Sequence, residues 1–301
     1  MKKKAILVTG GTGFLGSHLA KRLCFDGYKV IIIKRAASSL ARLEPLTEKF
    51  IFFDLDKENI RSLFLNYAIS TVIHCATDYG RDAEKPMSAF LANEVFPMDI
   101  LEAAFSKKVR LFFNIDTFFS ANPSCSYLGS YSLSKRHFQE WGHHYADMGR
   151  IGFLNLRLFH VYGPQDSPHK FVPTIISRCL NSEKIDLTDG FQKRDFIHVD
   201  DVVTAILSIV KAESHAQLSY RHYDIGTGNS LSIRDFSERV KKLCGGSAEL
   251  NFGAAPLRKG EFSDAHANVA PLRALGWMPK IGIEEGIQTV INDIHKKTNQ
   301  K

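Results

Sequence analysis

The sequence predicts an α/β protein with a doubly wound parallel sheet and a smaller, interleaved C-terminal domain. Short apolar runs that are typical of buried strands alternate with helical patterns through the first half of the chain. The first run leads directly into a glycine-rich turn and then a helical pattern. Beyond residue 164 the chain has short apolar stretches between Pro, Asn and Gly. We therefore expect a main domain over 1–164 plus 196–228 and a second domain over 165–195 plus 229–301.

The composition is that of a globular protein with room for a large core. The chain has 301 residues, of which 44% are apolar and 24% are charged. Its five cysteines are scattered, with no CxxC pair and no histidine cluster nearby, so neither a disulfide framework nor a metal site is expected. The apolar run after the first lysines stops at a glycine turn, and no later run is long enough for a bilayer. We expect a cytoplasmic protein without membrane contact.

The net charge of +7 is compatible with an anionic partner. The basic residues are dispersed along the chain, apart from short runs. This distribution favours a solvated surface and an anionic small substrate over a nucleic-acid groove.

The glycine-rich turn predicts a dinucleotide-binding (Rossmann) domain. Residues 5–9 form an apolar strand, Gly10, Gly13 and Gly16 follow, and a helical pattern runs on through Phe25. The first glycine allows a tight turn, the second lets the backbone approach a pyrophosphate, and the third allows close packing of helix on strand. The pyrophosphate would then lie at the helix N-terminus, beside Phe14 and Leu15.

The end of the second strand predicts the cofactor. An NAD site usually has Asp or Glu there for the ribose 2′-hydroxyl, whereas residues 29–33 are followed by Lys34 and Arg35. Two cations attract a 2′-phosphate, so we expect NADP(H), with help from Ser38 and Arg42. The alternative is a surface basic pair that happens to end a strand.

The next strand ends also point to the cofactor, because ligands of a doubly wound sheet lie at the carboxyl ends of its strands. The run 50–53 ends in Asp54 and Leu55, which are placed for the adenine, and the run 71–73 leads to Ala76. His74 is more simply explained as a packed structural histidine.

A candidate acid/base pair follows the strand at 109–115. Tyr131 and Lys135 are four residues apart in the first turns of a helix predicted over about 130–148, so they share one face. A buried ammonium beside a phenol favours the phenolate, and we expect it to lower the pKa of Tyr131 so that the phenol can exchange a proton with a substrate oxygen.

Elsewhere in the chain, we expect a helix over 87–105 that carries Asn93 and one strand over 153–161. We also expect helices over 171–181 and 283–294, a helix that ends at Val210, and a helix from Ser232 to about Cys244.

Four motifs in order resemble the extended short-chain dehydrogenase/reductase family of nucleotide-sugar epimerases, dehydratases and reductases. They are the glycine turn, Tyr131-x-x-x-Lys135, Arg157-x-x-x-Val161-Tyr162-Gly163-Pro164 and Arg194-Asp195-Phe196-Ile197-His198-Val199-x-Asp201. More narrowly, segments such as 116–119, 170–173, 185–190 and 250–254 look like the CDP-paratose/CDP-abequose synthase branch. Members of that branch are NADPH-dependent reductases of a CDP-4-keto-3,6-dideoxy sugar.

The resemblance implies roles for the matching positions. Tyr131 would give a proton to the 4-keto oxygen, and Lys135 would hold the nicotinamide ribose. Arg194 and Arg258 would bind the substrate diphosphate, which suits guanidinium chemistry. Phe171, Val172 and Leu187 would line the nucleotide pocket, although each could equally be core. The remaining expected contacts are Asn93 and Phe159 for the cofactor and Tyr79, Arg81 and His160 for the substrate.

One departure from the family pattern lies in the site itself. The family has a Ser or Thr just before the Asp of the strand-end motif, and here that residue is Ile115, which cannot hydrogen-bond a sugar oxygen. Thr117 lies two residues on, points to the same side if the chain stays extended, and is our candidate third catalytic residue. Otherwise water or Tyr131 alone serves, or the enzyme is slow or degenerate. A second departure is His160, where the family often has Asn.

The favoured reaction is net reduction. Dehydratases of this family carry an acid where this chain has Thr117, so elimination is disfavoured. The alternatives are an NAD-dependent nucleotide-sugar 4-epimerase and a non-catalytic dinucleotide-binding regulatory protein. The family also implies a homodimer that pairs the helix of Asn93 with the helix of Tyr131. Phe138, Trp141 and Tyr145 are consistent with such an interface, although their spacing is equally that of a core-facing stripe.

Overall fold

The computed structural model describes residues 5–80, 86–121, 128–258 and 260–298. The chain divides into two compact units, described separately below. The first unit contains residues 1–158 and 206–223, and the second contains residues 159–205 and 224–301.

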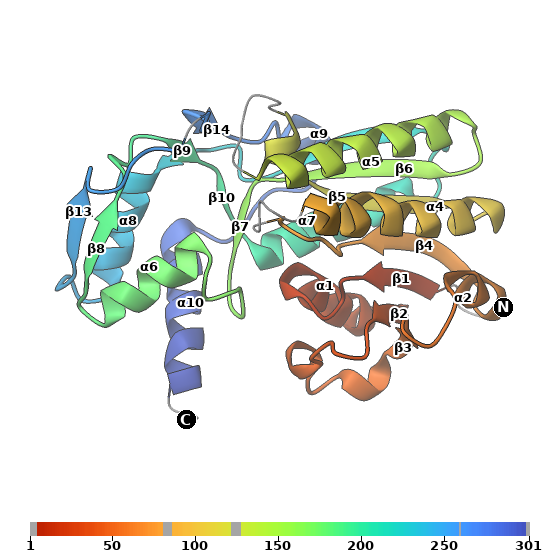
Figure 1. Ribbon diagram of the computed structural model, residues 1–301, viewed down its shortest axis with the longest axis horizontal. Coiled ribbons are helices and arrows are strands. Elements are labelled where there is room, and N and C mark those ends of the chain that lie inside the picture. Colours follow the sequence, from red (N-terminus) through yellow and green to blue (C-terminus); the bar gives the residue numbers. More distant parts are fainter. Residues whose placement is uncertain (1–4, 81–85, 122–127, 259, 299–301) are drawn as a thin grey trace. The chain divides into compact units, whose positions relative to one another are not determined.

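A seven-stranded sheet in the order β11-β6-β5-β4-β1-β2-β3 forms the centre of the first unit (Figure 1). Neighbouring strands from β3 to β6 pair in parallel, with Val8 opposite Ile32 on one side and Ile73 on the other. The order of β3 to β6 is that of a Rossmann fold. The strands are β1 Ala5–Thr9, β2 Lys29–Lys34, β3 Ile51–Asp54, β4 Ile69–His74, β5 Leu111–Thr117, β6 Gly152–Leu158 and β11 Tyr220–Ile225.

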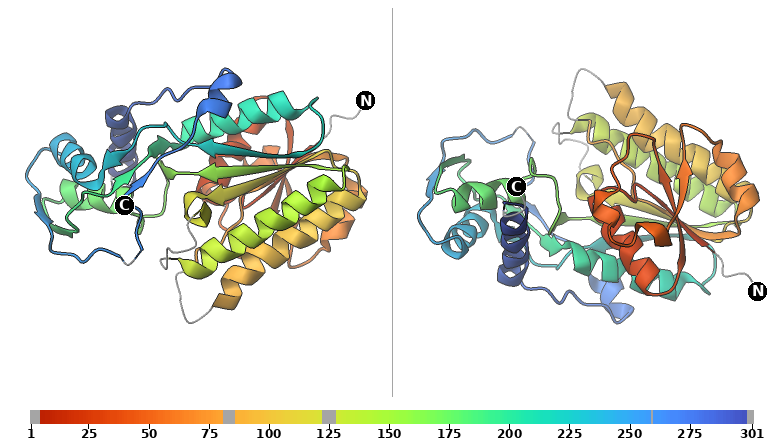
Figure 2. Two further views of the ribbon diagram at one scale, coloured as in Figure 1. Left: turned by 90° about the horizontal axis from the view of Figure 1, so that it is seen from above. Right: turned by 90° about the horizontal axis from the view of Figure 1, so that it is seen from below.

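Helices cover both faces of this sheet, as Figure 2 shows. Helices α2 (Ile60–Asn66), α4 (Phe96–Ser106) and α5 (Gly129–Asp147) lie on one face, and α1 (Phe14–Phe25) lies on the other. Every residue of β1 and β5 is buried, because the sheet has no solvent-facing side at its centre. The expectation of a doubly wound α/β fold is confirmed.

The second unit has its own core under shorter strands. The parallel pair β8 (Lys184–Leu187) and β13 (Glu249–Phe252) packs with α6 (Phe171–Leu180), α8 (Ile233–Leu243) and α10 (Ile283–Thr298). The remaining elements are β7 His160–Tyr162, β9 Lys193–Arg194, β10 Phe196–His198, α7 Val199–Glu213, β12 Leu231–Ser232, β14 Asp264–Ala265 and α9 Ala270–Ala274. Helix α7 and strand β11 each contain residues of both units.

Two expected elements are interrupted. The strand expected over 153–161 ends at Leu158, because the chain changes partner there. Phe159 N–H still donates to Ile225 O of β11, whereas His160 N–H donates to Asp195 O and β7 pairs in parallel with β10. The helix expected over 87–105 consists of α3 (Pro86–Phe90), a π-helical turn at Leu91–Val95 and α4. Such turns often lie near functional sites.

Candidate active site

The carboxyl end of β5 and the first turns of α5 bring together Tyr131, Lys135 and Thr117. Their exposed fractions are 6%, 1% and 6%. The Lys135 ammonium donates to the Ile115 carbonyl oxygen at 2.9 Å. Strand β5 stays extended through Thr117, whose hydroxyl, like that of Thr77, hydrogen-bonds to the Tyr131 phenol. The ring of Tyr79 lies 5.2 Å from that of Tyr131, centroid to centroid.

Burial raises the pKa of Tyr131 well above its ordinary value, and the nearby Tyr79 and Asp116 add to the rise. The hydrogen bonds from Thr117 and Thr77 act in the opposite direction but do not cancel it. The expected lowering of this pKa by Lys135 is therefore wrong. Lys135 is itself buried, which lowers its pKa to about 8, and its ammonium is directed to a backbone carbonyl. A phenol that keeps its proton suits a proton donor.

Asn93 is fully buried in the π-helical turn and connects the loop after β4 to helix α5. Its Oδ1 accepts from the Thr77 hydroxyl at 3.0 Å and from Asp78 N–H at 2.8 Å. Its Nδ2 donates to Asp78 O at 2.7 Å and to Ser134 Oγ at 3.2 Å. The residue expected to contact the cofactor thus holds in place the loop that carries Thr77 and Tyr79.

The glycine turn has the geometry that a dinucleotide requires. Gly10 has φ +64°, and a Cβ there would lie 2.6 Å from Ala76 N. A Cβ on Gly16 would lie 2.2 Å from Gly10 O, and one on Gly13 would lie 3.1 Å from it. No side chain caps the N-terminus of α1 at Gly13. The first-turn N–H groups are therefore oriented for an anionic pyrophosphate, and the residues present fit a dinucleotide.

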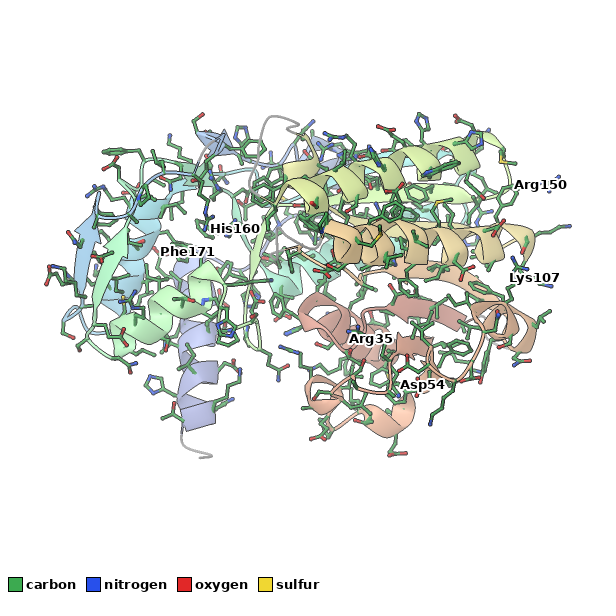
Figure 3. The ribbon with its side chains drawn as sticks, viewed as in Figure 1. Arg35, Asp54, Lys107, Arg150, His160 and Phe171 are labelled. Carbon is green, nitrogen blue, oxygen red and sulfur yellow. The ribbon has the colours of Figure 1, made fainter. Side chains whose placement is uncertain are left out.

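The basic pair after β2 is only partly available to a ligand. Lys34 Nζ lies 3.1 Å from Asp54 Oδ2 on the adjacent strand, and this hydrogen bond lowers the pKa of Asp54. Arg35 is exposed; it is labelled beside Asp54 in Figure 3. Ala36 N–H donates to an Asp56 carboxylate oxygen at 2.7 Å. Of the two cations, Arg35 is the one at the surface. Among the other expected cofactor contacts, Phe14, Leu15, Leu55, Ala76 and Phe159 are half-buried.

In the second unit, cations converge on His160. Burial and the charges of Arg194, Lys170 and Arg258 lower its pKa to about 3, so the imidazole is neutral. Its ring packs edge-on against Phe196, 5.1 Å away. These cations are suited to an anionic group, but two of them are already paired, Lys170 with Asp166 at 3.0 Å and Arg194 with Glu261 at 2.6 Å.

Arg194 is buried and already engaged. It bonds to Glu261 Oε1 at 2.6 Å and to the carbonyls of Lys193 and Phe262. Arg258 is exposed and lines a hollow of about 340 Å³ that Glu261 also lines. Val172 and Leu187 belong to the core of this unit, and Phe171 packs against it. Arg81 lies outside the described residues.

Sequence reasoning missed several polar residues around the site. Asn114 and Asn155 lie fully buried in β5 and β6, beside Asp116. Two asparagines inside otherwise apolar strands are unusual, and this signal could have revealed them. Glu261 and Asp56 had no such signal, because their partners are distant in the sequence.

Comparison with known proteins identifies the family of this chain. Residues 6–226 match the pattern of the NAD dependent epimerase/dehydratase family. The chain belongs to this family. The family match covers the glycine turn, the Tyr131–Lys135 pair and the Arg194 motif together.

Two curated members of the family are similar over nearly the whole chain. CDP-abequose synthase of Salmonella muenchen is 37% identical over 293 residues, 96% of this chain and 97% of that protein. The Salmonella typhimurium enzyme of the same name is 35% identical over 299 residues, 96% of this chain and 98% of that protein. The expected resemblance is confirmed.

Solved structures of the family have the same fold. MoeE5, solved with UDP-glucuronic acid and NAD, is 26% identical, with a TM-score of 0.81 over 97% of this chain and 99% of that one. UDP-glucuronic acid 4-epimerase from Bacillus cereus has a TM-score of 0.86 at 24% identity, over 97% of this chain and 99% of that one. Within the described part of this chain, no helix has the length and apolar character needed to cross a membrane.

Proposed function

We propose that this protein reduces the 4-keto group of a nucleotide-linked 4-keto-deoxysugar, with CDP as the nucleotide and NADPH as the reductant. The observation that carries the proposal is the buried Tyr131, which keeps its proton and is hydrogen-bonded by Thr117 at the end of β5. The similarity to CDP-abequose synthases supports the choice of a CDP-linked deoxysugar.

In this reaction the cofactor, when bound, supplies a hydride to C4 of the sugar. The phenol of Tyr131 gives its proton to the 4-keto oxygen, so that the ketone becomes an alcohol. The Thr117 hydroxyl, which already contacts the phenol, orients that oxygen and takes the place of the hydroxyl absent at Ile115. Lys135 holds the nicotinamide ribose and supplies positive charge as the phenol loses its proton.

Reduction is tested by incubating the protein with NADPH and CDP-, dTDP- and GDP-linked 4-keto-deoxysugars while NADPH absorbance is followed. We expect NADPH oxidation with the CDP-linked sugar, and none with the Tyr131→Phe variant under the same conditions. Tight NADPH binding without oxidation of NADPH by any of the three would favour a non-catalytic dinucleotide-binding protein.

The preference for NADPH rests on Arg35, since Lys34 is paired with Asp54. A guanidinium at the surface after β2 is suited to a 2′-phosphate. Arg35→Ser should raise the KM for NADPH about tenfold and leave the KM for NADH nearly unchanged. A wild-type preference for NADH would overturn this assignment.

The second candidate is an NAD-dependent nucleotide-sugar 4-epimerase. Relatives such as the putative UDP-glucose 4-epimerase of Methanocaldococcus jannaschii, 27% identical over 309 residues, favour it. An epimerase regenerates its cofactor within each turnover, so it would convert a nucleotide sugar without added NADPH. Epimer formation by the purified protein, without net cofactor consumption, would favour this candidate over the reductase.

The substrate diphosphate is proposed to bind the cations around His160 in the second unit, including Arg194 and Arg258. We assign the reaction to cytoplasmic deoxysugar biosynthesis for O-antigen lipopolysaccharide. We propose that the protein acts on this substrate without a nucleic-acid partner and without membrane contact.

A homodimer is proposed through the outer face of α3, the π-helical turn and α5. Exposed apolar residues gather there: Met87, Phe90, Leu91, Val95, Leu133 and Trp141. Phe138 is in the core and Tyr145 packs against it, so of the three aromatic residues only Trp141 has an outward position. Trp141→Glu should convert a dimer into a monomer in sedimentation, while Phe25→Glu, on the exposed end of α1, should not.

A further inference from the structure

Three polar side chains form a connected row on β5 and β6, and a fourth, Ser120, contacts the last of them. Asn114 on β5 and Asn155 on β6 are register partners and are both fully buried. Asn114 Nδ2 donates to Asn155 Oδ1 at 2.7 Å, and Asn155 Nδ2 donates to Asp116 Oδ2 at 2.8 Å. Ser120 Oγ lies 2.9 Å from the same Asp116 oxygen and 2.7 Å from Thr117 O, so its single proton is shared between these two acceptors. The row therefore ends at a carboxylate at the carboxyl end of β5.

The Asp116 carboxylate lies in an unusual environment. The residue is 2% exposed, and within the described residues its Oδ1 has no hydrogen-bond partner. A buried carboxylate costs several kcal/mol of folding free energy unless it is paired and hydrogen-bonded. Two hydrogen bonds to one oxygen offset only part of this cost, which indicates a role beyond stability.

The residues on each side of Asp116 carry the contacts of the candidate site. The carbonyl oxygen of Ile115, the residue before it, accepts a hydrogen bond from the Lys135 ammonium. Thr117, the residue after it, hydrogen-bonds to Tyr131. Fixing the Asp116 side chain through Asn155 and Ser120 fixes both of these groups, because they belong to the same extended segment.

Asp116 also raises the pKa of the buried Lys135, against the effect of burial. The titratable groups around Lys135 are His74 at the end of β4, Cys75 directly after it, Asp116 on β5 and Tyr131 on its own helix. Burial keeps His74 and the Cys75 thiol neutral, since it lowers the pKa of the first and raises that of the second to about 12. Tyr131 is neutral as well. Among these groups, Asp116 is the first to oppose the effect of burial on the pKa of Lys135.

We infer that Asp116, held by Asn155 and Ser120, is a positioning residue that keeps Lys135 charged and sets the place of Thr117 beside Tyr131. The role in turnover rests on the proposed function; the effect on Lys135 does not.

The charge is tested by titrating Lys135 directly. The side-chain resonance of Lys135 in protein with isotope-labelled lysine is assigned by its loss in Lys135→Met. It is then followed against pH in the wild type, where the pKa is about 8, and in Asp116→Asn. The variant retains an oxygen for Asn155 and Ser120 but removes the negative charge. We expect the midpoint to fall by about one pH unit or more. An unchanged midpoint in a folded variant would overturn the inference.

The positioning is tested with Asn155→Ser, which loosens the carboxylate and leaves its charge. The Lys135 midpoint should stay within about 0.3 pH units of the wild type, and kcat should fall about tenfold with little change in KM. A kcat equal to the wild type would show that Asp116 does not position Thr117. If no nucleotide sugar is reduced by the wild type, the proposed function fails, while the titration of Lys135 still decides the role of the charge.

Discussion

At the scale of single residues, the protonation state of Tyr131 follows from burial. The phenol is 6% exposed, and the loss of hydration disfavours the phenolate more than the hydroxyls of Thr117 and Thr77 stabilise it. Lys135 is subject to the same effect with the opposite sign, since burial disfavours its ammonium. The pair is thus a neutral donor beside a cation that a carboxylate helps to keep charged.

Tyr131→Phe should reduce kcat for ketone reduction by at least about a thousandfold, because the phenol hydroxyl that is hydrogen-bonded to Thr117 is lost. NADPH binding, measured by fluorescence titration, should change little. Turnover within tenfold of the wild type would show that another group supplies the proton.

Thr117→Val removes a hydroxyl and keeps the shape of the side chain. We expect kcat to fall about 10- to 100-fold, because the hydrogen bond to Tyr131 is lost, and we expect Thr117→Ser to retain most of the activity. Undiminished turnover in Thr117→Val would show that the missing hydroxyl at Ile115 is replaced by something else.

His160 makes stability depend on pH. Its pKa is about 3 in the folded protein and 6.5 in the unfolded chain. Below pH 6.5 the unfolded chain therefore binds a proton that the folded chain does not bind. This contribution to stability is present above pH 6.5 and is lost as pH falls, by about 2 kcal/mol at pH 5. In urea unfolding, the stability of His160→Asn should therefore fall by about 2 kcal/mol less than that of the wild type between pH 6.5 and pH 5. Parallel curves for both proteins would contradict the assignment.

At the scale of elements, the turn between β1 and α1 depends on the absence of side chains. A Cβ on Gly16 would overlap Gly10 O, which is backbone and cannot move without displacing the turn. The helix N-terminus that would hold the pyrophosphate is therefore placed by packing of glycine against glycine.

Gly16→Ala should lower the unfolding free energy by about 1–3 kcal/mol and abolish measurable NADPH binding. Gly129→Ala is the matched control, because Gly129 begins α5 and an added Cβ would meet no atom of the described residues within 4 Å. The control should keep both stability and binding, as measured by thermal unfolding and calorimetry. Normal binding in Gly16→Ala would show that the turn adapts.

At the scale of the whole molecule, the strand order of the first unit decides where a ligand binds. Strands β2 and β3 are added to the sheet on one side of β1, and β4, β5 and β6 are added on the other side. Ligands of such sheets bind where this order changes, at the carboxyl ends of the strands. The glycine turn after β1, Ala76 after β4 and the Tyr131 site after β5 all lie at these ends.

Ligand binding should stabilise the fold as a whole. NADPH at about 100 times its Kd adds about 2.7 kcal/mol to the free energy of unfolding, which corresponds to a Tm increase of roughly 5 °C. Scanning calorimetry with NADPH, NADH and no cofactor measures it. NADPH should raise the Tm more than NADH at equal concentration, and equal shifts would contradict the proposed role of Arg35.

Much of the first unit was predictable, because its signals are local. Strands such as 5–9 are apolar at every position since both faces of the sheet are covered, and the glycine turn follows directly. The break after Leu158 was not predictable, since it depends on the pairing of His160 with Asp195 and of β7 with β10, which lie further along the chain. Val172 and Leu187 could be core or pocket by pattern alone, and packing in the second unit makes them core.

The sequence by itself determined the dinucleotide fold, the family and the Tyr131–Lys135 pair, because periodicity, turn residues and spacing within one helix are local properties. The tertiary structure alone decided that Tyr131 keeps its proton, that Thr117 contacts it, that Asp54 pairs with Lys34 and Glu261 with Arg194, and that Asp116 lies buried beside the site. Those properties depend on burial and on contacts between distant segments, and both arise only when the chain packs.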